Sequence, residues 1–228
     1  MWIDEEIVNH CEKRLFFKIW FPQKSVIILG SSNQAENEIF IENVGEIPIF
    51  KRSGGGGTVV LHDGCLIVGL GAWVENYFAN NKYFKILNDS LIETLGRLGN
   101  FGFIYQDGIS DLACANKKLC GTSLFRSKNY MLFQASILID AKTDLITKLL
   151  KHPTKEPEYR RKRAHCDFLT DLKTLDPQFS RENLLGRFQN HFEKIVQGKL
   201  SSDFVDIEDS HAQYLKNRFS RKENAPSV

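Results

Sequence analysis

A run of four glycines is the most distinctive chemical feature of the sequence. Residues 52–58 read Arg-Ser-Gly-Gly-Gly-Gly-Thr and lie between two short apolar runs. Consecutive glycines lose much backbone entropy on folding, so a folded protein keeps them mainly where a ligand or another backbone must come close. Their N–H groups could line a phosphate or a carboxylate, with Arg52 supplying positive charge. The alternative interpretation is a flexible hairpin loop, because glycine-rich loops are common.

The residues around the run exclude two common types of phosphate-binding loop. No Gly-Lys-Ser/Thr sequence ends the run, which excludes a P-loop, and its spacing is not that of the dinucleotide-binding fingerprint before a helix. His62 and Asp63 follow shortly after Thr58. His62 is either a substrate contact or a structural histidine that packs against the loop.

A segment with two lysines is the second candidate for chemistry. Residues 111–123 read D-L-A-C-A-N-K-K-L-C-G-T-S. Side chains alternate in a hairpin, so Lys118, near Gly121 and two small hydroxyl residues, can project over a pocket while Lys117 faces water. Lysines in turns are usually solvated, and that is the alternative for Lys118.

Short strands joined by turns are predicted around both segments. The strands are expected at 18–21, 24–30, 47–51, 58–61, 66–70, 102–105, 111–114, 118–124 and 131–139, with a tight turn at Asn116-Lys117. Helical spacing of apolar residues predicts helices at 3–16, 34–43, 83–98, 145–152 and 181–196.

These elements predict the fold class. Strands outnumber helices in the first two thirds without strict β–α–β alternation, so we expect an α+β fold in which mixed or antiparallel sheets pack with helices. Residues 1–150 are the expected core and residues 151–216 a helical extension of the same domain. Residues 217–228 are the expected flexible basic tail.

Composition limits the classes of protein. The chain has 228 residues, 42% hydrophobic and 25% charged, which is typical of a globular domain, and its formal net charge of +2 gives no global field for nucleic acid. No run approaches the length of a membrane span, and the acidic start is not that of a signal peptide. Five cysteines without a C-x-x-C pair predict reduced thiols. We therefore expect a cytoplasmic protein that does not bind membranes.

Together, and in this order, the two segments resemble the biotin/lipoate protein ligase family, and most closely its lipoate-protein ligase branch. That family shows R-R-x-S-G-G-G-[AT]-V-x-H-D, then N-D-[IL] before G-x-K-[IV]-x-G-[ST]-[AS]. Here Arg52 matches the first arginine and residues 55–63 match the glycine loop with its histidine. Residues 111–112 match the aspartate pair and residues 116–123 match the lysine segment.

The resemblance implies an α+β catalytic domain that binds a fatty carboxylic acid, lipoate or octanoate, beneath the glycine loop. ATP and Mg²⁺ would serve to join the acid to AMP. Lys118 would be the catalytic residue that holds the carbonyl and α-phosphate oxygens, and Asp111 would help to hold magnesium. The implied substrate and nucleotide contacts are Arg52, Gly54, Gly55, Gly56, Gly57, Thr58, His62, Asp63, Gly121, Thr122 and Ser123.

The implied acceptor of the acyl group is a lysine of a lipoyl domain, in a 2-oxoacid dehydrogenase subunit or a glycine-cleavage H protein. The basic residues 158–170 could form a lid or dock an acidic acceptor by charge complementarity. A solvated helix face is the alternative. A nucleic-acid module is disfavoured because this cluster lacks interleaved aromatic residues.

Departures from the family pattern leave two other functions open. The second arginine of the pattern falls on Ser53, its asparagine on Ser110 and its glycine on Asn116. These losses remove hydrogen-bonding groups for a nucleotide. An octanoyl or lipoyl transferase would need no ATP, but the cysteines of such enzymes fall near Phe103, Gln106 and His152, where this chain has none. A non-catalytic acyl-binding or lipoyl-domain-binding homologue is the other alternative; the pattern favours the ligase.

Overall fold

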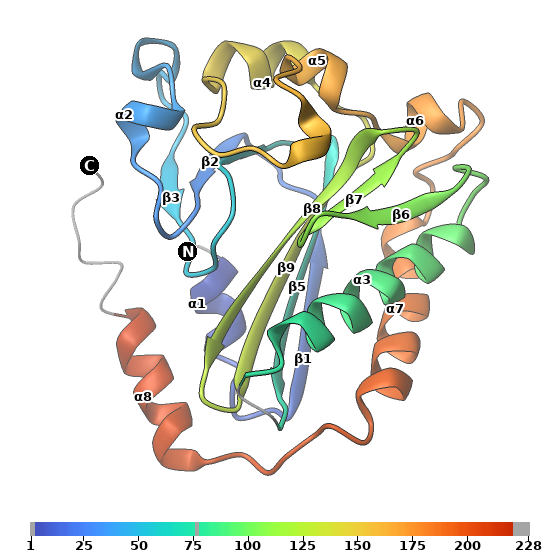
Figure 1. The fold of residues 1–228 in the computed structure, drawn as a ribbon. Coiled ribbons are helices and arrows are strands. Elements are labelled where there is room, and N and C mark those ends of the chain that lie inside the picture. The colour runs from blue at the N-terminus through green and yellow to red at the C-terminus, as the bar shows by residue number, and fades with distance from the viewer. Residues whose placement is uncertain (1–2, 76–77, 221–228) are drawn as a thin grey trace.

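A six-stranded sheet crosses the molecule in the computed structural model, which describes residues 3–75 and 78–220. The strand order is β1-β5-β9-β8-β7-β6, and all neighbours pair antiparallel (Figure 1). The strands are β1 (Leu15–Trp20), β5 (Cys65–Trp73), β6 (Ile104–Asp107), β7 (Asp111–Cys114), β8 (Lys117–Ser127) and β9 (Tyr130–Leu138).

A smaller sheet carries the glycine run at one of its ends. Its order is β3-β2-β4, with β2 (Val26–Leu29) parallel to β3 (Ile49–Lys51) and antiparallel to β4 (Val59–Leu61). The short helices α2 (Ala35–Glu38), η1 (Ile41–Asn43) and α4 (Thr143–Leu149) accompany it. Ile27, Val60 and Leu149 belong to one apolar cluster of this unit.

Helices cover both faces of the large sheet. On one face α3 (Asn80–Gly96) packs with α7 (Leu184–Leu200), where Leu87, Leu91 and Phe192 are fully buried (Figure 1). On the other face α1 (Ile3–Val8) contacts α8 (Asp209–Ser220). Every residue of β5 is buried between these layers. The remaining elements are η2 (Glu158–Arg160), α5 (His165–Phe168) and α6 (Leu172–Leu175).

The predicted α+β class is confirmed, but the first predicted helix is wrong in its length. α1 ends at Val8, and Leu15 and Phe16 belong to β1, where they pair with Ala72 and Gly71. Apolar residues on either side of a turn imitated one continuous helical stripe. The helix expected at 34–43 is likewise interrupted, because Ile39 forms a bridge with Leu150.

The C-terminal part differs from the expectation too. Residues 217–220 of the expected tail belong to α8, whose buried face includes His211, Leu215 and Phe219. Residues 221–228 lie outside the described residues. The tight turn is centred on Ala115 and Asn116, which both have positive φ, one residue earlier than predicted. Among the described residues, none of the helices combines the length and apolar character needed to cross a bilayer.

Candidate functional site

A cleft of about 940 Å³ opens where the two sheets meet. Both sheets contribute to its apolar lining, which includes Ile28, Val59, Leu61, Ile67 and Ala135. One wall is the glycine loop, defined here as residues 52–58, and the opposite wall is residues 153–160. The strand pair β7–β8 closes the cleft between them, and α2 contributes a polar shelf of Asn37 and Glu38.

Arg52 holds the glycine loop in shape from within. Its side chain is 7% exposed, and its Nη2 donates to the carbonyl oxygens of Gly55 at 2.7 Å and Gly57 at 2.8 Å. The carbonyl of Gly54 accepts from Ser31 N at 3.0 Å. Burial lowers the pKa of Arg52 to about 10, so the guanidinium stays charged at neutral pH. Arg52 therefore lines the cleft but gives its hydrogen bonds to the loop itself.

Close packing explains two of the four glycines. A Cβ on Gly54 would lie 2.0 Å from Ser123 Oγ, and Gly56 has a φ of +102°, which side chains rarely tolerate. The Gly56 carbonyl oxygen would lie 2.0 Å from a Cβ on Gly30. Within the described residues, the N–H groups of Gly55, Gly56 and Gly57 have no hydrogen-bond partner. Because loop carbonyls are hydrogen-bonded within the protein while these N–H groups remain available as donors, the loop is suited to bind an anion.

Asp4 connects α1 to the glycine loop. This carboxylate is 3% exposed, accepts from Ser53 N at 2.6 Å and accepts from the side chain of Gln134. Its charge also opposes the effect of burial on Arg52. In the sequence, Asp4 reads only as an acid in the first helical turn, so its role in supporting the loop was missed.

Lys118 lines the same cleft as the glycine loop. Its Nζ lies 2.7 Å from Asp111 Oδ1, and Asp111 is buried. A register shift between Leu112 and Ala113 against β8 inserts one extra residue there. This bulge lets Lys118 and Gly121 share the cleft face although they are three residues apart. A Cβ on Gly121 would come within 3.2 Å of Lys118 Nζ, so the glycine leaves room for the lysine.

The predicted hydroxyl residues line the cleft but bond within the protein. Thr58 Oγ1 accepts from Asn33 Nδ2 at 3.1 Å, and Thr122 Oγ1 donates to Ser110 O at 2.8 Å. Ser123 Oγ donates to Gly55 O at 3.2 Å. These contacts join the glycine loop to the strands beside Lys118.

His62 and Asp63 do not line the cleft. Val59 and Leu61 face it, and strand alternation points the next residue, His62, to the other side, where it is fully buried. Its Nδ1 accepts from Gly64 N at 3.0 Å, and burial lowers its pKa. Asp63 is exposed and pairs with Lys142, whose hydrogen bond lowers the carboxyl pKa. The geometry of His62 is that of the structural histidine.

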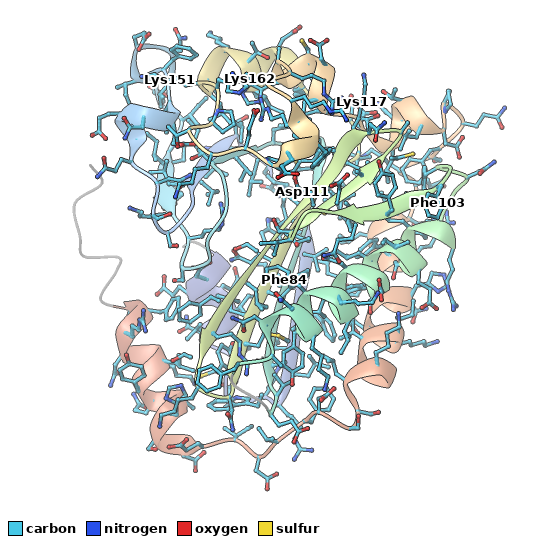
Figure 2. All side chains as sticks on the ribbon, viewed as in Figure 1. Phe84, Phe103, Asp111, Lys117, Lys151 and Lys162 are labelled. Carbon is cyan, nitrogen blue, oxygen red and sulfur yellow. The ribbon has the colours of Figure 1, made fainter. Side chains whose placement is uncertain are left out.

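Residues 153–163, here named the cap segment, form a wall that the sequence did not identify with certainty. The basic stretch 158–170 is not one helix, because only η2 and α5 are helical there, separated by a turn. Tyr159 OH donates to Asp111 Oδ2 at 3.0 Å, next to Lys118. Burial raises the pKa of Tyr159, which keeps its hydroxyl protonated as a donor. Figure 2 shows Asp111 near the centre of the molecule, below the labelled cap residue Lys162.

Arg160 and Thr154 also attach the cap segment to its surroundings. Arg160 is buried, and its guanidinium carbon lies 4.7 Å from the Phe168 ring centroid. Within the segment, Arg160 Nε lies 3.5 Å from Glu156 Oε2. Thr154 donates to Glu38 Oε1 at 3.1 Å. The residues missed in the sequence therefore act through contacts distant in the chain, which leave no local signal.

Four of the five cysteines are buried thiols. Burial raises the pKa of Cys11 to about 11 and of Cys65 to about 12, and it also raises the pKa of Cys114 and Cys120. Cys166 on α5 is exposed. In the described part of the chain, no group of three or more His, Cys, Asp or Glu is placed to hold a metal ion.

Two curated proteins are similar to this chain over most of its length. An inactive lipoate–protein ligase 2 from Plasmodium falciparum (isolate 3D7) is 26% identical over 89% of this chain, which spans only 60% of that relative. The octanoyltransferase LipM from Clostridioides difficile (strain 630) is 24% identical, over 98% of this chain and 91% of the relative. The relatives thus include a protein named as an acyltransferase and one named as inactive.

Solved structures share the fold at low sequence identity. A bi-partite lipoate protein ligase from Thermoplasma acidophilum, described with its E2 lipoyl domain, matches with a TM-score of 0.72 at 16% identity, over 99% of this chain and 89% of that one. A lipoate-protein ligase A bound with ATP matches with a TM-score of 0.72 at 18% identity and the same coverage. The family model for the lipoyl protein ligase A/B catalytic domain matches residues 1–193. The chain belongs to this lipoyl protein ligase A/B family.

Proposed function

We propose that the protein is a lipoate-protein ligase that joins lipoate or octanoate to AMP and then transfers the acyl group to a lysine of a lipoyl domain. One observation carries the proposal. Lys118 and the free amides of Gly56 and Gly57 line one cleft, which also has apolar residues in its lining. A cation and N–H groups in the same cleft suit an acyl phosphate, and the apolar residues suit an alkyl chain.

The first step joins the acid to the nucleotide. A carboxylate oxygen of the fatty acid attacks the α-phosphorus of ATP, an acyl–phosphate bond forms, and pyrophosphate leaves. Lys118 stabilises the negative charge on the α-phosphate, with the N–H groups of Gly56 and Gly57, which also line the cleft, as further donors. Lys118 must leave Asp111 for this, so ligand binding would exchange one ion pair for another.

Asp111 is the residue that would hold magnesium. A Mg²⁺ bound with a nucleotide takes one or two carboxylates and several phosphate or water oxygens, so a lone carboxylate beside the phosphate site fits this donor set. Asp111 is buried at the cleft and has the hard oxygen atoms that Mg²⁺ prefers. The ion would screen the charge of the triphosphate.

The second step moves the acyl group to the acceptor. The uncharged amine of a lipoyl-domain lysine attacks the acyl carbonyl, AMP leaves, and the amide forms with loss of one proton. The Thermoplasma ligase that shares this fold is described with such a domain, which supports the choice of acceptor. Reduced thiols suit the cytoplasm, and we include that location in the proposal.

An ATP-independent transferase is the second candidate, because LipM is among the relatives. That route needs a thiolate that takes the acyl group as a thioester. Burial raises the pKa of Cys65, Cys114 and Cys120, which disfavours them as nucleophiles at neutral pH. Cys166, exposed beside the cap segment, is the remaining candidate.

One experiment separates the functions. The protein is incubated with an apo lipoyl domain and lipoate, with and without MgATP, and both proteins are weighed by mass spectrometry. A ligase modifies the acceptor only with ATP and releases pyrophosphate, also in the Cys166→Ala variant. An acyl adduct on a cysteine, formed from an acylated carrier without ATP, would establish the transferase instead. Binding of acyl adenylate without modification under any condition would indicate a non-catalytic homologue.

A further inference from the structure

The basic residues of the cap segment divide into two sets that point in different directions. Arg160 is buried against Phe168, and Arg163 donates from Nη2 to Asn116 O at 2.7 Å and to Tyr159 O at 2.8 Å. Both guanidinium groups are therefore used inside the protein. Arg161 and Lys162, between them, are exposed.

The backbone at these two exposed cations is unusual. Arg161 has a φ of +51° and Lys162 a φ of +58°, so two consecutive side-chain-bearing residues lie in the left-handed region. Such backbone is uncommon outside glycine, asparagine and aspartate, and it persists only where the surroundings hold it. Here Lys162 N donates to Glu156 Oε1 at 2.8 Å, and the anchored Arg160 and Arg163 fix both ends of the turn.

A third cation joins them from another element. Lys117 is exposed at the start of β8, directly after Asn116, whose carbonyl accepts from Arg163. In Figure 2, Lys117 and Lys162 are labelled at the same end of the molecule, above Asp111. We name Lys117, Arg161 and Lys162 the basic rim. Within the described part of the chain, their side chains form no ion pair or hydrogen bond.

We propose that the basic rim is the docking surface for an acidic patch that flanks the acceptor lysine of the partner protein. The rim adjoins the two residues on which the proposed chemistry rests, because Lys117 precedes Lys118 and Tyr159 of the same cap segment contacts Asp111. An acceptor lysine has a short reach, so its protein must contact the cleft mouth. Unpaired cations there favour a partner with carboxylates around that lysine.

Nucleic acid fits the rim less well. Proteins that hold nucleic acid through its backbone use about 6–10 phosphate contacts, and the rim offers three cations. A small set of fixed cations is instead suited to steer and orient a compact acidic surface.

The test uses a variant that removes charge without adding backbone strain. Asparagine tolerates positive φ, so the rim variant is Arg161→Asn, Lys162→Asn and Lys117→Gln. A control variant with the same change in net charge is Lys24→Gln, Lys85→Gln and Lys194→Gln, at exposed positions away from the cleft. The probe is an apo lipoyl domain whose acceptor lysine is flanked by carboxylates, and a second version has amides there.

The inference rests on the proposed function, but binding and turnover are measured separately. We expect the rim variant to raise the acceptor KM by about tenfold, the size of a charge-pair effect on association. Release of pyrophosphate from ATP in the presence of lipoate should stay unchanged. The amide version of the acceptor should bind both proteins equally weakly. Calorimetric binding of the acceptor shows the same loss even if no acyl transfer occurs, which separates failure of this inference from failure of the ligase proposal.

Three results would overturn the docking surface. These are equal acceptor affinity in the parent and the rim variant, an equal loss in the control variant, and loss of retention on single-stranded DNA without any change in acceptor binding. The last result would assign the rim to nucleic acid.

Discussion

The glycine loop and the cap segment form opposite walls of one cleft, yet different kinds of bond hold them. Arg52, Ser31 and Ser123 hold the loop by hydrogen bonds to its backbone carbonyls, and Asp4, outside the cleft lining, accepts from Ser53 N. At the cleft the cap segment is tied through carboxylates, since Glu38 accepts from Thr154 and Asp111 accepts from Tyr159. Arg163 adds a bond to the backbone carbonyl of Asn116. Backbone carbonyls do not titrate and cannot take a different rotamer, whereas carboxylates do both. The comparison indicates a rigid wall facing an adjustable one.

Lys118→Ala should have the largest effect on activity, because it removes the ammonium group from the cleft that both walls line. Loss of one positioned donor to a developing anion lowers kcat by about 10²–10³-fold. We expect that loss in ATP-dependent modification of a lipoyl domain, with little change in Tm. Lys117→Ala is the matched control and should keep kcat. Full turnover by Lys118→Ala at saturating substrate would refute its catalytic role.

Gly56→Val tests the rigidity of the loop. A side chain at a φ of +102° is strained by about 1–3 kcal/mol, and its Cβ would lie 2.9 Å from Arg52 Nη2. We expect acyl-ligand affinity, measured by calorimetry, to fall more than tenfold while Tm changes by only a few degrees. Gly55→Val, in open space, is the control for folding. Unchanged affinity in Gly56→Val would favour the flexible hairpin.

Asp4→Ala tests whether α1 supports the loop. The change removes the carboxylate that accepts from Ser53 N, and a hydrogen bond to a charged group contributes about 1.5–3 kcal/mol. We expect a lower Tm and an acyl-ligand Kd raised about fivefold. Asp4→Asn keeps an acceptor for Ser53 N and should recover most of the loss. Equal defects in the two variants would mean that charge, not the hydrogen bond, is what matters.

Tyr159→Phe weakens the adjustable wall by one hydroxyl. The hydrogen bond to Asp111 is lost while the ring stays against Phe168. We expect the substitution to speed amide hydrogen exchange in residues 153–163 more than in residues 52–58. The KM for ATP should rise about threefold while kcat is unchanged. A hydrogen bond to a charged group contributes about 1.5–3 kcal/mol, and water replaces part of this contribution. A fall in kcat at constant KM would instead place Tyr159 in the chemical step.

Low pH should slightly lower the free energy of unfolding, because one histidine lies near each wall of the cleft. Burial lowers the pKa of His62, behind the loop, and of His165, beside the cap segment. Below the ordinary histidine pKa of about 6.5, these histidines bind more protons in the unfolded chain than in the folded chain. The free energy of unfolding is therefore at its maximum above about pH 6.5 and decreases as the pH falls. Thermal melts from pH 7.5 to 5.0 should show a smaller decline in His62→Asn and in His165→Asn than in the parent. An unchanged decline in both variants would assign acid sensitivity to other groups.

The sequence predicted one wall of the cleft better than the other. The glycine loop and the Lys118 strand have local signals, namely a glycine run and a lysine beside small residues. The contact between Tyr159 and Asp111 joins positions 48 residues apart, and no local pattern announces it. Periodicity found the long helix α3 but extended α1 too far. It also could not reveal that His62 lies on the far side of β4, since the side that a strand residue faces depends on register.

The packing of the loop also separates two kinds of mutational constraint. A Cβ on Gly30 would clash with the Gly56 carbonyl and a Cβ on Gly54 with Ser123, while a side chain at Gly56 would be strained by its positive φ, so the fold itself disfavours side chains at these positions. A Cβ on Gly55 or Gly57 would meet no atom within 4 Å. If substitution of Gly55 or Gly57 abolishes activity, the cause is therefore a clash with the ligand rather than a disturbed fold. Gly30, although distant in sequence from the glycine run, is under the same packing constraint. Packing of the fold and the shape of the ligand therefore constrain different glycines.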